Sequence, residues 1–125
     1  MMMETTGSER RQYLRAALRC RVQYIHDDGL FTDCAEDISE GGLRLGGATR
    51  IPLREQVKLF LPVPVAAHHD REALCLLQGE VIWRAKGRTG VRFVEPSPES
   101  LRQIREYVRR AGFEAKRLAW NKPLC

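Results

Sequence analysis

Apolar side chains recur at every second position in several short segments of this chain, and this period is the feature that most limits its fold. In the first such segment, Cys20, Val22 and Tyr24 alternate with arginine and glutamine. Successive side chains of a strand point to opposite faces, so this alternation is typical of a strand with one buried face. The turn-forming run 26–29 then separates it from the next segment. The pattern predicts a mainly β protein.

We expect strands near residues 20–24, 30–38, 43–45, 56–61, 73–83 and 88–94, the fifth being the longest. Short strands joined by hairpin signals favour a closed antiparallel barrel, which leaves no edge unpaired. Pro62 and Pro64 are expected to end the fourth strand, because proline donates no hydrogen bond to a sheet. The following segment, which holds His68 and His69, is expected to be a solvated surface loop without a metal site.

A helix is predicted after the last strand. Ser97 can cap its N-terminus, Pro98 suits the first helical position, and Gly112 is expected to end it. Within these bounds four apolar residues form one stripe: Leu101, Ile104, Tyr107 and Val108. We expect this stripe to pack over an open end of the barrel.

Length and composition indicate one globular domain. The chain has 125 residues, 43% of them hydrophobic and 30% charged, and a net charge of +5 that favours anionic partners. No apolar run is long enough to span a bilayer, and the first residues do not resemble a signal peptide, so we expect a cytoplasmic protein without a membrane partner. The four cysteines lack C-x-x-C spacing and do not predict a zinc site.

Residues 37–42, with the sequence Asp-Ile-Ser-Glu-Gly-Gly, form a polar turn between the second and third expected strands. Asp37 and Ser39 lie two residues apart, so in extended backbone they face the same side and can meet one ligand edge. Gly41 and Gly42 allow positive φ and let a flat ligand approach the main chain. An ordinary hairpin loop rich in turn-formers is the alternative interpretation.

An arginine cluster, Arg10, Arg11 and Arg15, precedes the first strand. Arginine pairs bidentately with phosphate and with the O6/N7 edge of guanine. The Asp37 carboxylate can accept hydrogen bonds from the opposite edge of a guanine, so the cluster and the polar turn could together hold a guanine nucleotide. A solvated charged face is the alternative, and the segment 9–18 is compatible with a short helix or with an arm that orders on binding.

The two motifs together resemble the PilZ domain family, the bacterial receptor module for cyclic di-GMP. The pattern Arg11-x-x-x-Arg15 followed by Asp37-x-Ser39-x-x-Gly42 is similar to the pair of motifs of that family. The later strands and the C-terminal helix fit its small six-stranded antiparallel barrel, so the resemblance covers roughly residues 9 to 112. It implies a flexible N-terminus (1–8), a PilZ-like domain (9–112) and a C-terminal tail (113–125).

The resemblance also implies a function. Arg11 and Arg15 would hold phosphates and guanine, Asp37 and Ser39 would read a guanine edge, and Gly41 and Gly42 would admit it closely. In this family an arginine at the position of Arg10 accompanies the binding of two stacked ligand molecules. Some members have a stacking aromatic at the position of Trp83. The alternative interpretation of Trp83 is an aromatic packed in the core or at the rim. The implied protein is a receptor that changes conformation on binding cyclic di-GMP and signals to an unidentified effector protein, for example in motility or biofilm control.

Other function classes fit the sequence less well. Some PilZ-like proteins are ligand-independent interaction adaptors, but here the motif residues are all present. A nucleic-acid-binding barrel would carry a row of aromatics on one sheet face, which the sequence does not predict. We expect no enzyme and no cofactor, since Asp37 and Ser39 have no partnered base in sequence reach.

Overall fold

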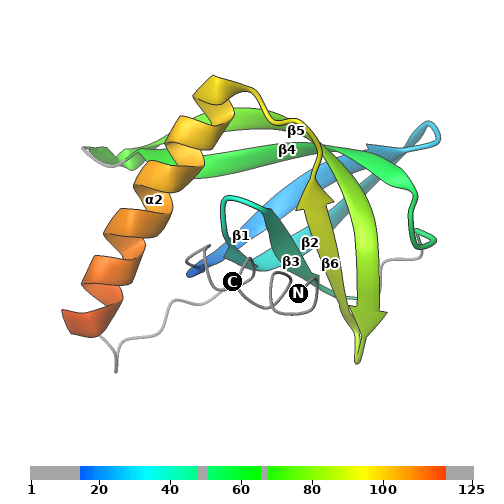
Figure 1. The fold of residues 1–125 in the computed structure, drawn as a ribbon, viewed down its shortest axis with the longest axis horizontal. Coiled ribbons are helices and arrows are strands. Elements are labelled where there is room, and N and C mark those ends of the chain that lie inside the picture. Colours follow the sequence, from blue (N-terminus) through cyan, green and yellow to red (C-terminus); the bar gives the residue numbers. More distant parts are fainter. Residues whose placement is uncertain (1–14, 48–50, 66–67, 118–125) are drawn as a thin grey trace, which may run out of the picture.

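The computed structural model describes residues 15–47, 51–65 and 68–117, and the side chains of all of these except 68–70 and 112–117. Six strands close into an antiparallel barrel in the order β1-β2-β3-β6-β5-β4 (Figure 1). The elements are β1 (Ala16–His26), β2 (Gly29–Ile38), β3 (Gly42–Gly46), β4 (Gln56–Val65), β5 (His68–Ala85), β6 (Arg88–Phe93) and helix α2 (Pro98–Arg117). The mainly β class and the six-stranded barrel are therefore confirmed.

The barrel interior holds one hydrophobic core. On β1 the predicted alternation is confirmed, because Val22 and Tyr24 are buried while Arg21 and Gln23 are exposed. The largest fully buried side chains come from strands and helix alike: Tyr24, Ile38, Leu43, Leu45, Leu59, Leu61 and Ile104. Burial of each such aliphatic side chain contributes about 1.5–3 kcal/mol, which makes this core the main source of stability.

Strand β4 continues through both prolines, so the prediction that Pro62 and Pro64 end it was wrong. The surface loop expected at His68 and His69 was also wrong, because β5 begins at His68. Only residues 58–60 of β4 pair with β1, whereas the ladder with β5 runs on to Val65. The Sγ atom of Cys20 on β1 lies 3.9 Å from the carbonyl oxygen of Pro62. Backbone groups of one strand residue point to the same side, so the missing N–H of Pro62 faces β1, where no ladder needs it.

Helix α2 packs against β1, β4 and β5 and closes one end of the barrel (Figure 1). Its N-terminus is capped as predicted, because Ser97 Oγ accepts a hydrogen bond of 3.1 Å from the backbone N–H of Ser100. Ile104 and Val108 are buried in the barrel core. The helix runs past Gly112 to Arg117, which corrects the predicted end. A glycine inside a helix costs only about 1 kcal/mol relative to alanine and does not by itself stop it.

Two irregularities interrupt the ladders that position the polar turn. Strand β1 shifts register against β2 between Ala17 and Cys20, where Arg19 has a φ of 49°. Strand β2 shifts register against β3 between Ala35 and Asp37, so that Glu36 is an extra residue on β2. Such bulges re-aim side chains next to functional sites. For the segment 9–18 the sequence was compatible with a short helix or with a flexible arm. The structure shows a strand from Ala16 onward. Residues 9–14 lie outside the described residues.

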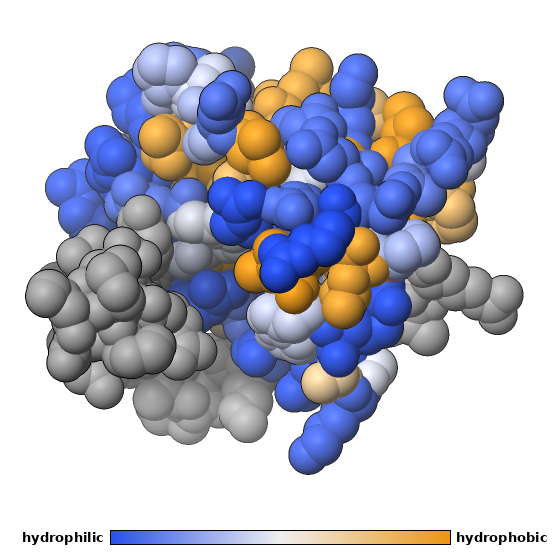
Figure 2. Space-filling view, turned by 45° about the vertical axis from the view of Figure 1, so that its right-hand side comes forward, coloured by the Kyte–Doolittle hydropathy of each residue, from blue (hydrophilic) through white to orange (hydrophobic). Residues whose placement is uncertain are grey.

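The surface is mostly polar. Seen with the right-hand side of Figure 1 turned forward, hydrophobic residues form separate small patches among hydrophilic ones (Figure 2). No helix among the described residues has both the length and the hydrophobicity needed to cross a membrane.

Candidate ligand-binding site

The polar turn connects β2, which ends at Ile38, to β3, which begins at Gly42. The backbone N–H of Ser39 donates to the carbonyl of Gly42 at 2.8 Å, and the N–H of Gly41 donates to Ser39 Oγ at 3.2 Å. Ser39 is buried. The turn is thus held by its own hydrogen bonds between two paired strands, so its shape is set before any ligand arrives.

Glycine at position 42 is needed for a close contact between strands, and not for the positive φ that the sequence suggested. Within the described segments, the glycines with positive φ are Gly47 and Gly87. A Cβ atom on Gly42 would lie 2.1 Å from the carbonyl oxygen of Val91 on β6. Glycine is therefore required here because β3 and β6 approach too closely for any side chain.

Arg15 joins the two motifs. Its Nε and Nη2 atoms donate to Asp37 Oδ1 at 2.9 and 2.6 Å, and its Nη1 donates to Ser39 Oγ at 3.3 Å. Asp37 and Ser39 therefore face the same side, as their spacing predicted. The Asp37 side chain is only 12% exposed, whereas that of Arg15 is half exposed. The guanidinium is thus the movable partner of this pair.

Arg44 is a site residue that the sequence reasoning missed. It lies directly opposite Asp37 in the β2–β3 ladder, and its Nη2 atom hydrogen-bonds Asp37 Oδ2. Both carboxylate oxygens of Asp37 are therefore engaged by arginine, one from each side. The signal was available in the hairpin register, because a turn that pairs Ile38 with Leu43 also pairs Asp37 with Arg44.

Further ion pairs extend from Arg44 across the neighbouring strands. Arg44 Nε lies 3.7 Å from Glu36 Oε1, and Arg88 Nε lies 3.0 Å from the same oxygen. These groups border a hollow of about 600 Å³ beside Arg15. Four arginines and two carboxylates line it, so this side of the polar turn carries a net positive charge that suits an anion.

A larger cavity of about 860 Å³ also borders Arg15 and extends from the polar turn to α2. Trp83 forms part of its wall and is 39% exposed. The indole lies against Gly90, where a Cβ atom would come within 2.2 Å of Trp83 Nε1. Trp83 is therefore a rim aromatic with one face packed on backbone, a geometry that leaves it able to stack on a flat ligand.

Glu40 connects the polar turn to the helix. Arg105 Nη2 donates to Glu40 Oε1 at 3.2 Å, and both residues line the larger cavity. The hydrogen bond with Glu40 and the charge of its carboxylate raise the pKa of the Arg105 guanidinium above its usual value. No local sequence pattern predicts this pair, because its members lie 65 positions apart.

The structure brings together six of the eight residues predicted for the site: Arg15, Asp37, Ser39, Gly41, Gly42 and Trp83. Arg10 and Arg11 lie outside the described residues. Within the described part of the chain, no cluster of His, Cys, Asp and Glu could hold a metal ion. The roles of these residues toward a ligand stay predictions.

Comparison with solved structures gives the same fold. The PilZ domain of YcgR from Escherichia coli, solved with c-di-GMP, matches with a TM-score of 0.60 and 15% identity, over 90% of this chain and 99% of that one. The PilZ domain of CeSA from a cellulose-synthesizing bacterium matches with a TM-score of 0.55 and 18% identity, over 80% and 97%. At these identities the likeness concerns the fold alone.

A third solved structure is the motility inhibitor MotI (DgrA) of Bacillus subtilis, which matches with a TM-score of 0.71 and 15% identity over 83% of this chain. The match covers 52% of MotI, so this chain spans about half the length of that protein. A search of curated protein sequences found no match. The family model described as PilZ domain matches residues 9–110, most of the chain. With the motif pair and the barrel, this match shows that the chain belongs to the PilZ domain family.

Proposed function

We propose that this protein is a receptor for cyclic di-GMP that changes conformation on binding and signals to a protein partner. The observation that carries the proposal is the convergence of Arg15, Asp37 and Ser39 at the mouth of a cavity whose wall includes Trp83. A guanidinium, a carboxylate and an exposed aromatic face are the groups that a guanine nucleotide requires. The solved PilZ domain of YcgR, which contains c-di-GMP, supports the choice of ligand.

The hydrogen bonds of Asp37 suggest how the site would respond to ligand. Its Oδ1 accepts two bonds from Arg15, and its Oδ2 accepts one from Arg44. A carboxylate has about four acceptor positions, so a guanine edge that needs both oxygens must displace at least one bond from Arg15. Arg15 is half exposed and can turn toward a phosphate, while Arg44 keeps the carboxylate in place. Ligand would thus exchange an arginine contact for a guanine contact.

Release of Arg15 from Asp37 would move the chain segment that leads into β1. That segment contains Arg10 and Arg11, which would close on the ligand from the N-terminal side. Ordering of a chain segment by ligand is an established way to change the surface that a protein shows to its partner. Arg10 further suggests a second ligand molecule stacked on the first, which the binding stoichiometry would reveal.

Calorimetric titration with cyclic di-GMP tests the proposal, with GTP and cyclic di-AMP as ligand controls. We expect saturable binding of cyclic di-GMP alone, and a loss of more than about ten-fold in affinity for Arg15→Ala, since a charge-assisted hydrogen bond contributes about 1.5–3 kcal/mol. Lys86→Ala, in the turn between β5 and β6, is the matched cationic control and should bind as the wild type does. Absence of heat and of any melting shift at excess ligand would favour a ligand-independent adaptor instead.

A further inference from the structure

The outside of the barrel carries exposed leucines away from the polar turn. Leu74 and Leu76 of β5 are 63% and 59% exposed, while their neighbours Cys75 and Leu77 are buried. Both faces of this part of β5 are therefore apolar. The outward face of an antiparallel barrel strand is normally polar, because it meets water. Exposed aliphatic side chains that lie together on one surface indicate an interaction site.

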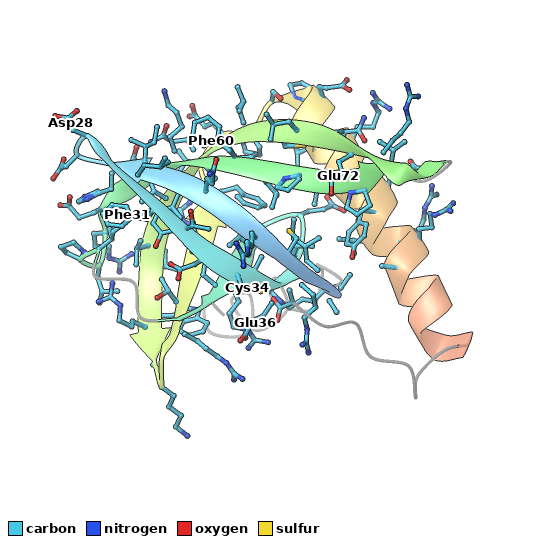
Figure 3. All side chains as sticks on the ribbon, turned by 180° about the vertical axis from the view of Figure 1, so that it is seen from behind. Asp28, Phe31, Cys34, Glu36, Phe60 and Glu72 are labelled. Carbon is cyan, nitrogen blue, oxygen red and sulfur yellow. The ribbon has the colours of Figure 1, made fainter. Side chains whose placement is uncertain are left out.

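These leucines continue an apolar surface on the adjacent strand. Leu76 lies opposite Phe60 of β4, and Leu74 lies opposite Pro62. We call these four residues the outer apolar face. Phe60 in turn lies opposite Gln23 of β1. Figure 3, which views the barrel from behind, shows Phe60 on β4 next to β1.

A hollow of about 380 Å³ opens where β1 and β4 diverge at the outer apolar face. Its lining residues are Arg21, Gln23, Thr32, Phe60, Pro62 and Leu74. None of them lines the cavity at the polar turn. This surface is therefore separate from the candidate ligand-binding site, and an inference about it does not require that cyclic di-GMP binds.

Two exposed cations accompany the outer apolar face. Arg21 lines the hollow, and Lys58 lies two residues from Phe60 on the same face of β4. Neither forms a salt bridge with any described residue, in contrast to Arg15, Arg44 and Arg88 at the polar turn. A carboxylate on this surface, Glu72, lies opposite Pro64 at the far end (Figure 3). Apolar surface beside exposed positive charge is complementary to a segment that alternates apolar and acidic side chains.

We propose that the outer apolar face binds an acidic, apolar segment of a partner protein. An apolar side chain of the segment would enter the hollow beside Leu74, and its carboxylates would lie against Arg21 and Lys58. Gln23 offers a donor and an acceptor at the hollow, which matches a peptide bond. A second copy of this chain fits less well, because its net charge is +5 and the face would meet the same exposed cations.

Fluorescence anisotropy with the full chain tests this proposal. The probe is a labelled peptide of about ten residues in which leucine alternates with glutamate, and the control peptide has lysine in place of glutamate. We expect the wild type to bind the glutamate peptide in preference to the lysine peptide. Leu74→Ser and Arg21→Glu should each weaken that binding by about five-fold or more, and Arg21→Glu should also improve binding of the lysine peptide.

Matched variants control for general effects on the surface. Leu53→Ser removes an exposed leucine in the segment between β3 and β4, and Lys86→Glu reverses a cation in the β5–β6 turn. Both should bind the glutamate peptide as the wild type does. Melting curves for all variants establish that each is folded. Equal weakening by the control variants, or no binding of either peptide at about 1 mM, would overturn the proposal.

Other occupants of the face give distinct results, each of which would also overturn the proposal. Concentration-dependent dimers in sedimentation that disappear in Leu74→Ser would assign the face to a second copy. Flotation with phosphatidylglycerol vesicles that depends on Leu74 would assign it to a lipid surface. If a chain ending at Arg117 bound the glutamate peptide about ten-fold more tightly than the full chain, the occupant would be the chain's own C-terminal segment.

Discussion

Arg105 of α2 donates a hydrogen bond of 3.2 Å to Glu40 in the polar turn, and this contact joins the helix to the candidate site. Both side chains border the same cavity. A ligand that moves the turn would therefore pull on a helix that packs against β1, β4 and β5. Through this ion pair the candidate site is connected directly to the helix that closes one end of the barrel.

Replacing Arg105 by alanine should uncouple the helix from ligand without unfolding the domain. The pair is exposed, so the melting temperature of Arg105→Ala should stay close to that of the wild type. Hydrogen exchange of the α2 amides, measured with and without cyclic di-GMP, should show less ligand-induced protection in the variant. Arg109→Ala is the matched control, because Arg109 pairs with Glu106 within the helix at 3.1 Å. Equal loss of protection in both variants would contradict the coupling.

Arg44→Ala should weaken cyclic di-GMP binding although Arg44 lies outside both motifs. The variant leaves Asp37 Oδ2 without its arginine partner. Burial of the charged carboxylate then costs more free energy, and the side chain is less well oriented toward a ligand. We expect the free energy of unfolding, measured in urea, to fall by about 1 kcal/mol, and the affinity for cyclic di-GMP to fall as well. Arg88→Ala is the comparison, because Arg88 pairs with Glu36 and not with Asp37. It should weaken cyclic di-GMP binding less than Arg44→Ala does. The reverse order in calorimetry would show that Asp37 needs no second arginine.

Gly42→Ala should destabilise the barrel itself. The new methyl group would lie 2.1 Å from the Val91 carbonyl oxygen, so β3 and β6 must separate. Overpacking of this kind costs about 1–3 kcal/mol, measurable by urea denaturation. Gly29→Ala is the comparison, because there the nearest atom is the end of the Phe31 ring at 3.0 Å, which can move aside. A loss no larger than that of Gly29→Ala would contradict the close approach.

Gly90→Ala should act on Trp83 and not on the strand backbone. The three atoms nearest to the new methyl group all belong to the Trp83 indole, the closest at 2.2 Å. The indole must therefore turn away from its position on the cavity wall. We expect altered tryptophan fluorescence and weaker cyclic di-GMP binding at nearly unchanged stability. Two results together would show that Trp83 has no role in the ligand contact. Trp83→Phe would bind cyclic di-GMP as the wild type does, and adding Gly90→Ala to Trp83→Phe would not weaken binding.

Cys20 should react slowly with iodoacetamide in the folded protein. Burial, with a smaller contribution from the Glu72 carboxylate, raises the pKa of the Cys20 thiol to about 11. The reactive thiolate is then about 100-fold scarcer at pH 8 than for a thiol at the ordinary value of 9.0, and labelling should accelerate as the pH approaches 11. Peptide-resolved mass spectrometry of native and urea-unfolded samples provides the comparison. Equal rates in the two samples would show that Cys20 is not shielded.

The barrel could be predicted from the sequence because the patterns that indicate strands and helix caps involve only neighbouring residues. Alternation such as that of Val22 and Tyr24 depends only on neighbouring residues, and so does the cap at Ser97. The meeting of Asp37 and Ser39 on one side was predictable for the same reason, since two residues of extended backbone determine it. These parts need no knowledge of the tertiary structure.

The parts that the sequence did not predict depend on partners elsewhere in the chain. Gly42 is a glycine because of Val91, and Glu40 meets Arg105 only once α2 has packed. The continuation of β4 through Pro62 depends on which edge of β4 lacks a partner strand. Composition and periodicity carry no record of such contacts.

The extra residue at Glu36 has a consequence for how motifs of this kind can be moved between proteins. Ala35 and Ile38 are both buried, so the in-and-out phase of β2 inverts between them, and Asp37 faces outward where unbroken alternation would turn it into the core. Placing residues 35–38 in an unbroken strand would leave every residue of both motifs present, yet it would direct the Asp37 carboxylate into the barrel interior. Transplanting the motif therefore requires transplanting the phase inversion that precedes it.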